Sequence, residues 1–122
     1  MKAASAKNKG RRLELLVAKE LRRKGIDKEA KRMILSGGSY LKGDVWAPNI
    51  NYLIECKNQE KVRLWEWWDQ TVNECGFKTP MLVVSANYRE PLVVMRLDDV
   101  LNLLQIEKES LNAATSSDNH KP

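Results

Sequence analysis

The chain has 122 residues and a formal net charge of +5, with 43% hydrophobic and 30% charged residues. This length and composition predict one domain with its own core, rather than two domains or a disordered chain. No apolar run approaches the roughly 20 residues of a membrane span, and no apolar segment follows the basic N-terminus. We therefore expect a cytoplasmic protein with no membrane partner.

Two further classes of site are not expected. Cys56 and Cys75 are interpreted as reduced thiols, because a chain of this length without an export signal has little use for a disulfide. A zinc site is unsupported, since there is no CxxC pair and the only histidine, His120, lies close to the C-terminus. No motif indicates a small-molecule cofactor.

The charge is unevenly distributed along the chain. Residues 1–43 carry a balance of +9, whereas residues 44–122 carry a balance of −4. A basic half joined to a mildly acidic half suggests a polyanionic partner on one side of the molecule. A charged surface that only promotes solubility would have the same charge balance. Charge alone therefore does not distinguish it from a surface that binds a polyanion.

The N-terminal part combines an expected arm with a predicted helix. Residues 1–8 are rich in Ala, Ser and Lys and are expected to form a flexible basic arm. Apolar residues then recur at spacings of three and four over about residues 9–24, which predicts a helix that ends at Gly25. At 100° per residue, Glu14 lies at the edge of the apolar stripe, as Glu20 also does. The basic side chains that gather on the opposite face are Arg11, Arg12, Lys19, Arg22 and Arg23.

Three short strands are predicted next. They cover about residues 32–35, 43–47 and 52–57, and the second carries Asp44 near its start. A glycine- and serine-rich loop over residues 36–39 would let backbone approach a ligand closely.

The second half of the chain predicts a helix, two strands and a last helix. The first helix spans about residues 64–75, and two apolar strands follow over residues 81–87 and 91–97. Asp98 is a good N-cap for the last helix, and residues 110–122 are expected to form a disordered tail. The order predicts an α/β fold, with a central mixed sheet of about five strands flanked by helices, in a domain of residues 9–109.

The stretch "YLIECK", residues 52–57, is an apolar strand with polar residues on one face. Because side chains alternate along a strand, Glu55 and Lys57 share a face that is either solvated or built for a ligand. If the strand pairs with its predecessor, Asp44 and Glu55 can converge at one sheet edge. Two carboxylates held together repel unless a cation lies between them, and Mg²⁺ prefers such oxygen ligands. The backbone carbonyl of Cys56 could supply a further oxygen.

The spacing D-x(10)-E-x-K also occurs by chance, and a surface Glu/Lys pair on a strand is ordinary. The ordered set of features is more specific than the spacing. Lys9-Gly10 precedes Glu14, and Arg32, the loop "SGGS", Asp44, "IECK", a helix with Gln70 and the stretch "GFKTP" follow. Over about residues 7–105 the chain resembles the PD-(D/E)XK nuclease superfamily, and within it the archaeal-type Holliday junction resolvases with their virus-encoded relatives.

This resemblance implies a restriction-endonuclease-like core and a set of site residues. Glu14, Asp44 and Glu55 would form the acidic metal site with the Cys56 carbonyl, and Lys57 would be the catalytic lysine. The cofactor would be Mg²⁺, with Mn²⁺ as a substitute. The residues implied in DNA binding are Lys9, Arg11, Arg12, Arg32, Ser36 and Ser39.

The same resemblance implies a homodimer that makes paired nicks in a four-way DNA junction, in the host cytoplasm if the chain is virus-encoded. Water activated by Mg²⁺ and aligned by Lys57 would attack the phosphorus and leave a 5′-phosphate. A related nuclease acting on flaps, forks or duplex DNA is the first alternative, since the fold does not choose the substrate. A catalytically inert junction-binding module is the second.

Two features depart from the superfamily pattern. Gly43 stands where the superfamily is named for a proline, and the cluster "WEWWDQ" is unusually rich in tryptophan. On a helix, Trp65 and Trp68 share a face while Trp67 points elsewhere. Core packing, a dimer interface and stacking on unpaired bases are all open for these rings, and we favour core packing plus a dimer interface.

Overall fold

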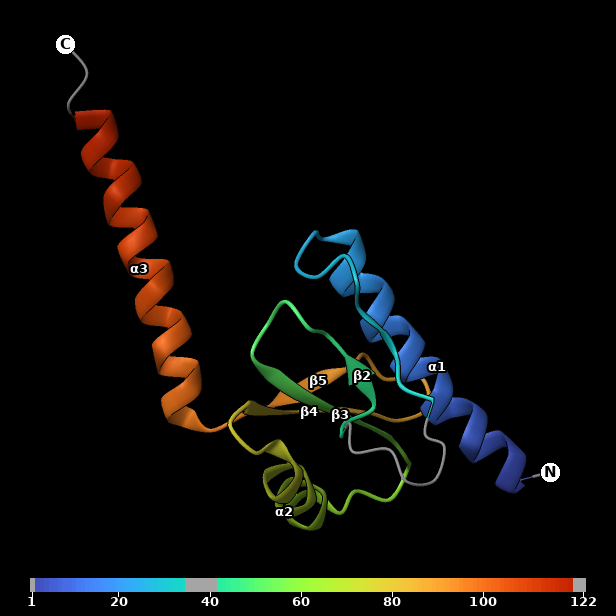
Figure 1. Ribbon diagram of the computed structural model, residues 1–122. Helices are drawn as coiled ribbons and strands as arrows, with labels where there is room; N and C mark the ends of the chain where they lie inside the picture. Colours follow the sequence, from blue (N-terminus) through green and yellow to red (C-terminus); the bar gives the residue numbers. More distant parts are fainter. Residues whose placement is uncertain (1, 35–41, 120–122) are drawn as a thin grey trace.

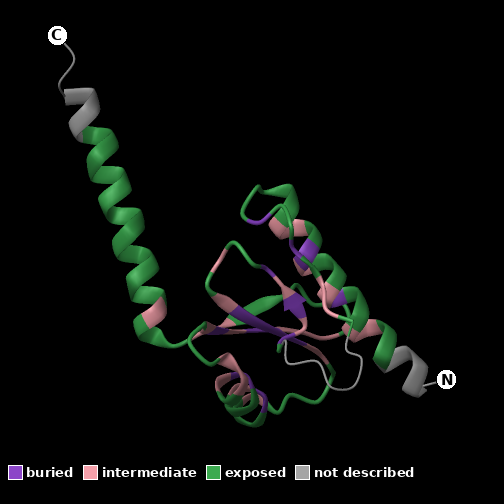
Figure 2. Cartoon of the chain, viewed as in Figure 1, coloured by how far each residue is buried: buried purple, intermediate pink, exposed green. Residues whose placement is uncertain are grey.

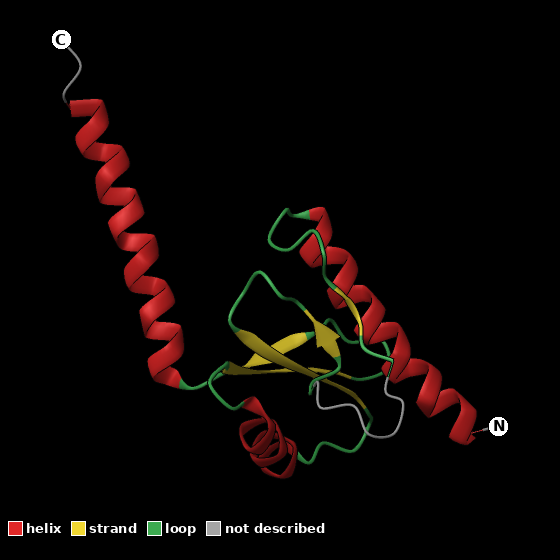
Figure 3. Cartoon of the chain, viewed as in Figure 1, coloured by secondary structure: helices red, strands yellow, loops and turns green. Residues whose placement is uncertain are grey.

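The computed structural model describes residues 2–34 and 42–119, and its architecture is a five-stranded mixed sheet with helices around it (Figures 1 and 3). The sheet order follows the chain, β1-β2-β3-β4-β5. The predicted α/β class and the mixed sheet of five strands are therefore confirmed. The elements are α1 (Lys2–Arg23), β1 (Lys31–Arg32), β2 (Val45–Trp46), β3 (Tyr52–Asn58), α2 (Leu64–Cys75), β4 (Thr79–Ser85), β5 (Leu92–Val94) and α3 (Leu97–Asn119).

The connections explain the strand directions. The pairs β1–β2, β2–β3 and β4–β5 are antiparallel, whereas β3 and β4 are parallel. A parallel pair needs a crossover segment, and α2 supplies it. This arrangement places β3 near the middle of the sheet, where the sequence "YLIECKN" supplies an apolar strand.

The two faces of the sheet are covered by different helices. On one face, Ile54, Cys56 and Val83 pack against Leu13 and Ala18 of α1 and form the main core. Because side chains alternate along β3, Glu55 belongs to the opposite face, over which α2 packs against β3 and β4. The strand β3 is largely buried (Figure 2), and it is apolar toward α1 and partly polar toward α2.

The second helix coincides with its predicted range. α2 spans Leu64–Cys75 and ends at Gly76, whose φ is 55°. Trp67 is 6% exposed and packs toward the sheet, whereas Trp65 is 74% exposed. Trp68 is half-buried and shares a groove with Trp65, as their common helical face predicted.

The helices at both ends are longer than the sequence predicted. α1 begins at Lys2 instead of about residue 9, because alanine and lysine favour helix and outweigh the single unfavourable residue, Gly10. α3 continues to Asn119, through residues that we expected to be disordered, since "LNAA" propagates a helix once it has formed. It begins at Leu97, so Asp98 lies in the first turn rather than at the N-cap.

The predicted strands also shift at their ends. β4 starts at Thr79 and includes Pro80, which a strand tolerates where its neighbour leaves one side free. β5 pairs only with residues 82–84 of β4. The first strand is limited to Lys31–Arg32, and residue 35 lies outside the described residues. No helix among residues 2–34 and 42–119 is long and apolar enough to cross a membrane.

Candidate active site

Asp44 is held beside β3 by backbone and side-chain hydrogen bonds. Its backbone N–H donates to the Ile54 carbonyl at 2.8 Å, and its own carbonyl accepts from the Met33 N–H at 2.9 Å. Its Oδ2 accepts a 2.8 Å hydrogen bond from the backbone N–H of Cys56. The predicted pairing of the two strands is present, with Val45 opposite Ile54. A carboxylate so held has little rotamer freedom left to lose on binding a ligand.

Gly43 makes this placement possible. Its φ is 93°, in the region that L side chains rarely adopt. A Cβ on this residue would lie 3.2 Å from the Ile54 carbonyl oxygen and 3.4 Å from Leu53 Cγ. Proline has its φ locked near −65°, so this backbone cannot hold the proline for which the superfamily is named.

Glu55 is a buried carboxyl among other carboxyls. It is 4% exposed and lies on the α2 face of β3. Burial, a hydrogen bond with Glu74 of α2, and the charge of Asp44 raise the pKa of Glu55 to about 10. The carboxyl therefore holds a proton at neutral pH unless a cation replaces that proton.

Glu14 approaches the same region from α1. Its Oε1 accepts a 2.7 Å hydrogen bond from Arg32 Nε in a largely buried ion pair. Burial and the charge of Asp44 raise the pKa of Glu14, while Arg32 and Lys57 oppose that rise. The structure thus gathers Glu14, Asp44, Glu55 and Lys57, although they come from α1, from the residue before β2 and from β3.

Cys56 contributes through its backbone rather than its sulfur. Burial and the nearby carboxylates raise the pKa of the Cys56 thiol well above its ordinary value, so the thiolate is not available as a ligand. The Cys56 N–H points toward Asp44, and the carbonyl of a strand residue lies on the same side as its N–H. This geometry is compatible with the carbonyl ligand expected from the sequence.

The carboxylates of the candidate site offer ligands for the divalent cation that the superfamily implies. Within residues 2–34 and 42–119, no three carboxylate, cysteine or histidine side chains converge into a metal-binding group. The Asp44 and Glu55 carboxyls lie close enough to share a hydrogen bond. Two hard carboxylate ligands, with water in the remaining positions, are an arrangement that Mg²⁺ accepts. The pair fits such a cation, whereas Glu14 is engaged with Arg32.

The residues implied in DNA binding have different surroundings. Arg11 and Arg12 are exposed on α1, whereas Lys9 is half-buried and its carbonyl accepts a 3.4 Å hydrogen bond from Asn58 Nδ2. Arg32 Nε donates to Glu14 Oε1, and its predicted contact with a phosphate stays a prediction. Gln70 is exposed on α2. Two predicted loop residues, Ser36 and Ser39, lie outside the described residues.

Sequence reasoning missed two side-chain contacts within the candidate site. Glu74 was overlooked, although a helix that buries Trp67 and Thr71 brings the residue three positions later to the same face. The pairing of Arg32 with Glu14 joins residues 18 positions apart. No local pattern could have found that contact.

Comparison with known proteins identifies the family of the chain. Residues 5–121 match the family described as "Phage putative PDDEXK endonuclease". No curated protein and no solved structure gives a significant match. The match covers nearly the whole chain, so the chain belongs to this family of PD-(D/E)XK endonucleases.

Proposed function

We propose that this protein is a Mg²⁺-dependent endodeoxyribonuclease that resolves four-way DNA junctions by paired nicks. The observation that carries the proposal is the Asp44–Glu55 carboxyl pair, where the start of β2 meets the central strand β3 that also carries Lys57. Family membership supports endonuclease chemistry, and the preference for branched DNA rests on the sequence resemblance. A nuclease of this kind would work in the host cytoplasm.

Hydrolysis requires a water oxygen to bond to phosphorus while the bond from phosphorus to the 3′ oxygen breaks. The products are a 5′-phosphate and a 3′-hydroxyl. A divalent cation held by Asp44 and Glu55 would polarise the phosphate and lower the pKa of a bound water; Mn²⁺ would substitute for Mg²⁺.

The chain's own groups have distinct parts in this reaction. The hydrogen bond from Cys56 orients Asp44, and Arg32 orients Glu14. The Lys57 ammonium can orient the attacking water and offset negative charge that develops on the phosphate. Arg11 and Arg12 can contact backbone phosphates, which predicts affinity that falls with salt and little sequence preference.

A homodimer forms part of the proposal because two nicks need two active sites at matched separation. Helix α3 carries a stripe that is exposed in one copy (Figure 2): Leu97, Val100, Leu101, Leu104 and Leu111. Leu97, Leu104 and Leu111 recur every seven residues, the spacing at which two helices pack together. An isolated helix with such a stripe is marginal in water, so α3 of a second copy is the partner that we propose.

The exposed indole of Trp65 adjoins this stripe. Together with Trp68 and Leu97 it lines an apolar groove of about 210 Å³ where α3 leaves the sheet. The groove would extend the contact between two copies, in line with the dimer role that we favoured for this ring.

Cleavage assays at near-physiological salt test the proposal. Four-way junction, flap and linear duplex of equal length are incubated with Mg²⁺, and Glu55→Gln is the inactive control. Glu66→Gln, which changes an exposed carboxylate of α2, is the matched active control. Paired symmetric nicks in the junction alone support a resolvase. Equal cutting of all three substrates supports a general nuclease, and binding without cutting in any divalent metal supports an inert module.

A further inference from the structure

A cleft lies between α1 and the turn from β4 to β5. Its volume is about 540 Å³. Leu13 and Asn58 line it, and each is the immediate neighbour of a candidate site residue, Glu14 and Lys57. Because side chains alternate along β3, Asn58 faces α1, whereas Glu55 and Lys57 belong to the opposite face; the cleft is thus linked to the site through the end of β3 and through α1. Its polar lining includes Lys9, Arg12, Asn58, Asn87, Tyr88 and Arg89.

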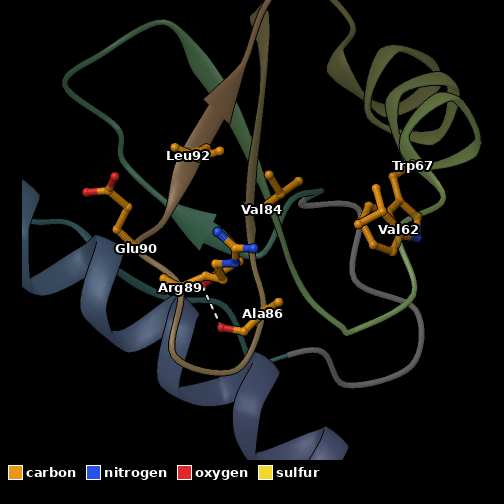
Figure 4. Close-up of a pocket in the computed structure, with 8 residues that line it drawn as sticks. Val62, Trp67, Val84, Ala86, Arg89, Glu90 and Leu92 are labelled. Atoms are coloured by element: carbon orange, nitrogen blue, oxygen red, sulfur yellow. Dashed lines mark hydrogen bonds between the residues drawn. The ribbon is translucent and has the colours of Figure 1, made fainter.

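The cleft has the charge expected for a polyanion. Lys9, Arg12 and Arg89 are among its lining residues, and no lining residue is acidic. Its surface is also more polar than that of the apolar pocket on the α2 side of the same turn (Figure 4), which Val62, Trp67 and Leu92 line. A basic, open cleft of this kind suits a phosphodiester backbone better than an apolar ligand.

Tyr88 stands at the tip of the turn with its ring fully in solvent. It is 106% exposed, and it is the one non-glycine residue with a positive φ in the described part of the chain, at 59°. An exposed tyrosine on a turn is unremarkable by itself. Its position at the rim of a basic cleft in a nuclease-family chain gives the ring a partner, an unpaired base of DNA.

Hydrogen bonds close the turn that carries Tyr88. The Arg89 N–H donates to the Ala86 carbonyl at 3.2 Å (Figure 4), and Ser85 Oγ donates to the Arg89 carbonyl at 3.0 Å. The Asn87 N–H donates to Glu60 Oε1 at 2.9 Å, which ties the turn to the segment that follows β3. A turn fixed in this way presents an aromatic ring with little conformational entropy left to lose on binding.

The floor of the cleft also holds an unused acceptor. Asn58 Oδ1 is buried and has no hydrogen-bond partner among the described residues. Its amide nitrogen donates weakly to the Lys9 carbonyl, at 3.4 Å. A buried acceptor without a partner is costly, so this end of β3 is not optimised for stability alone.

We propose that this cleft binds unpaired DNA next to a branch point, with an unpaired base stacked on Tyr88 and adjacent phosphates held by Lys9 and Arg12. Every base has a face that can stack on an aromatic ring, so such a contact is tolerant of sequence. The proposal rests on the proposed nuclease function and adds to it the means by which branched DNA would be preferred to duplex.

The test measures binding in EDTA, so that it does not depend on cleavage. Fluorescence anisotropy compares a flap with a short single-stranded arm with a blunt duplex of equal length. Tyr88→Asn removes the ring with a residue that tolerates positive φ, and Tyr88→Phe keeps the ring. Phe77→Leu is the matched control, because Phe77 is 104% exposed and lies before β4, whereas Tyr88 lies after it.

Tyr88→Asn is expected to weaken flap binding about tenfold, within the range that alanine substitution gives for one stacked base. Duplex binding should change less than about twofold, and Tyr88→Phe and Phe77→Leu should bind as wild type. 2-Aminopurine in the unpaired arm should be quenched by wild type and Tyr88→Phe, and not by Tyr88→Asn. Equal flap and duplex binding by wild type, or equal binding of the flap by wild type and Tyr88→Asn, would overturn the proposal.

This result can be told apart from failure of the nuclease proposal. If the protein binds flaps through Tyr88 yet cuts nothing in Mg²⁺ or Mn²⁺, the cleft proposal stands and the nuclease proposal fails. If the protein cuts branched DNA equally well with and without the Tyr88 ring, the nuclease proposal stands and the cleft proposal fails.

Discussion

The backbone N–H of Cys56 donates a 2.8 Å hydrogen bond to Oδ2 of Asp44, which joins the two acidic segments of the candidate site. The contact sets Asp44 next to the strand that carries Glu55 and Lys57. Asp44 therefore depends on the backbone of β3 for its position, and burial, Glu74 and Asp44 together raise the pKa of Glu55 and keep it protonated. Single substitutions that leave the fold intact should therefore alter either the position of Asp44 or the protonation of Glu55.

Glu55→Gln should stabilise the protein in the absence of metal while abolishing cleavage. The pKa of Glu55 is raised from an ordinary 4.5 to about 10. A raised folded-state pKa contributes stability that is present below the unfolded pKa and is lost as pH rises through the folded pKa. Wild type should therefore lose stability between about pH 4.5 and 10 through this group, and Glu55→Gln should not.

Thermal unfolding followed by circular dichroism in EDTA, from pH 5 to 9, checks this prediction. At pH 8 we expect a gain of several kcal/mol for Glu55→Gln, since one pKa unit is worth about 1.4 kcal/mol and pH 8 lies more than three units above the ordinary pKa of 4.5. Glu66→Gln, on the exposed face of α2, should show no such gain. A lower melting temperature for Glu55→Gln at every pH would contradict a protonated, crowded carboxyl.

Gly43→Pro should inactivate the protein even though proline is the residue for which the superfamily is named. The φ of 93° at Gly43 is closed to proline, so the substitution must move Asp44 away from Cys56. Gly43→Ala should also be unfavourable, by about 1–3 kcal/mol, because of the positive φ and the 3.2 Å approach to the Ile54 carbonyl.

Gly10→Ala is the matched control for both changes. Gly10 is helical and its added Cβ meets nothing within 4 Å, so alanine should stabilise α1 by about 0.5–1 kcal/mol. Urea denaturation and cleavage of a branched substrate are the measurements. Full activity in Gly43→Pro would show that Asp44 does not need this backbone.

Arg32→Met should reduce cleavage most strongly at low pH. Arg32 opposes the rise of the Glu14 pKa that burial and Asp44 cause. Without the guanidinium the pKa of Glu14 should rise further, so the acid limb of the pH–rate profile should move to higher pH. We expect a loss of about tenfold or more at pH 6 and a smaller loss at pH 8.

The control for this prediction is another arginine with a carboxylate partner. Arg23 pairs with Glu20 at 2.7 Å, but both side chains are exposed. Exposed pairs contribute little, so Arg23→Gln should leave the pH profile unchanged. The same loss of rate at every pH for Arg32→Met would indicate a phosphate contact instead of an effect on Glu14.

Leu104→Glu should convert a dimer to a monomer without unfolding the domain. Leu104 lies within the proposed stripe of α3, whereas Ile106 points roughly to the opposite side of the same helix. Both side chains are exposed, so neither change disturbs a core. Sedimentation velocity at micromolar concentration should give a monomer for Leu104→Glu and a dimer for wild type and Ile106→Gln. A dimer that persists in Leu104→Glu would place the interface elsewhere.

The sequence by itself determined the order of the elements, the range of α2, the apolar strand β3 with its polar face, and the candidate site residues. These features rest on local physics: hydrophobic period, glycine at helix ends, and alternation along a strand. The same local reasoning was weakest at the chain ends, where α1 and α3 extend beyond their predicted limits. Helix propagation there depends on neighbouring turns more than on single residues.

Only the tertiary structure decided which of these residues meet. The positive φ of Gly43 and the pairing of β2 with β3 place Asp44 against Cys56. The packing of α1 brings Glu14 to Arg32, and the packing of α2 brings Glu74 to Glu55. Such contacts join residues far apart in the chain, and they form because burying the apolar faces of both helices fixes where the polar residues at their edges must lie.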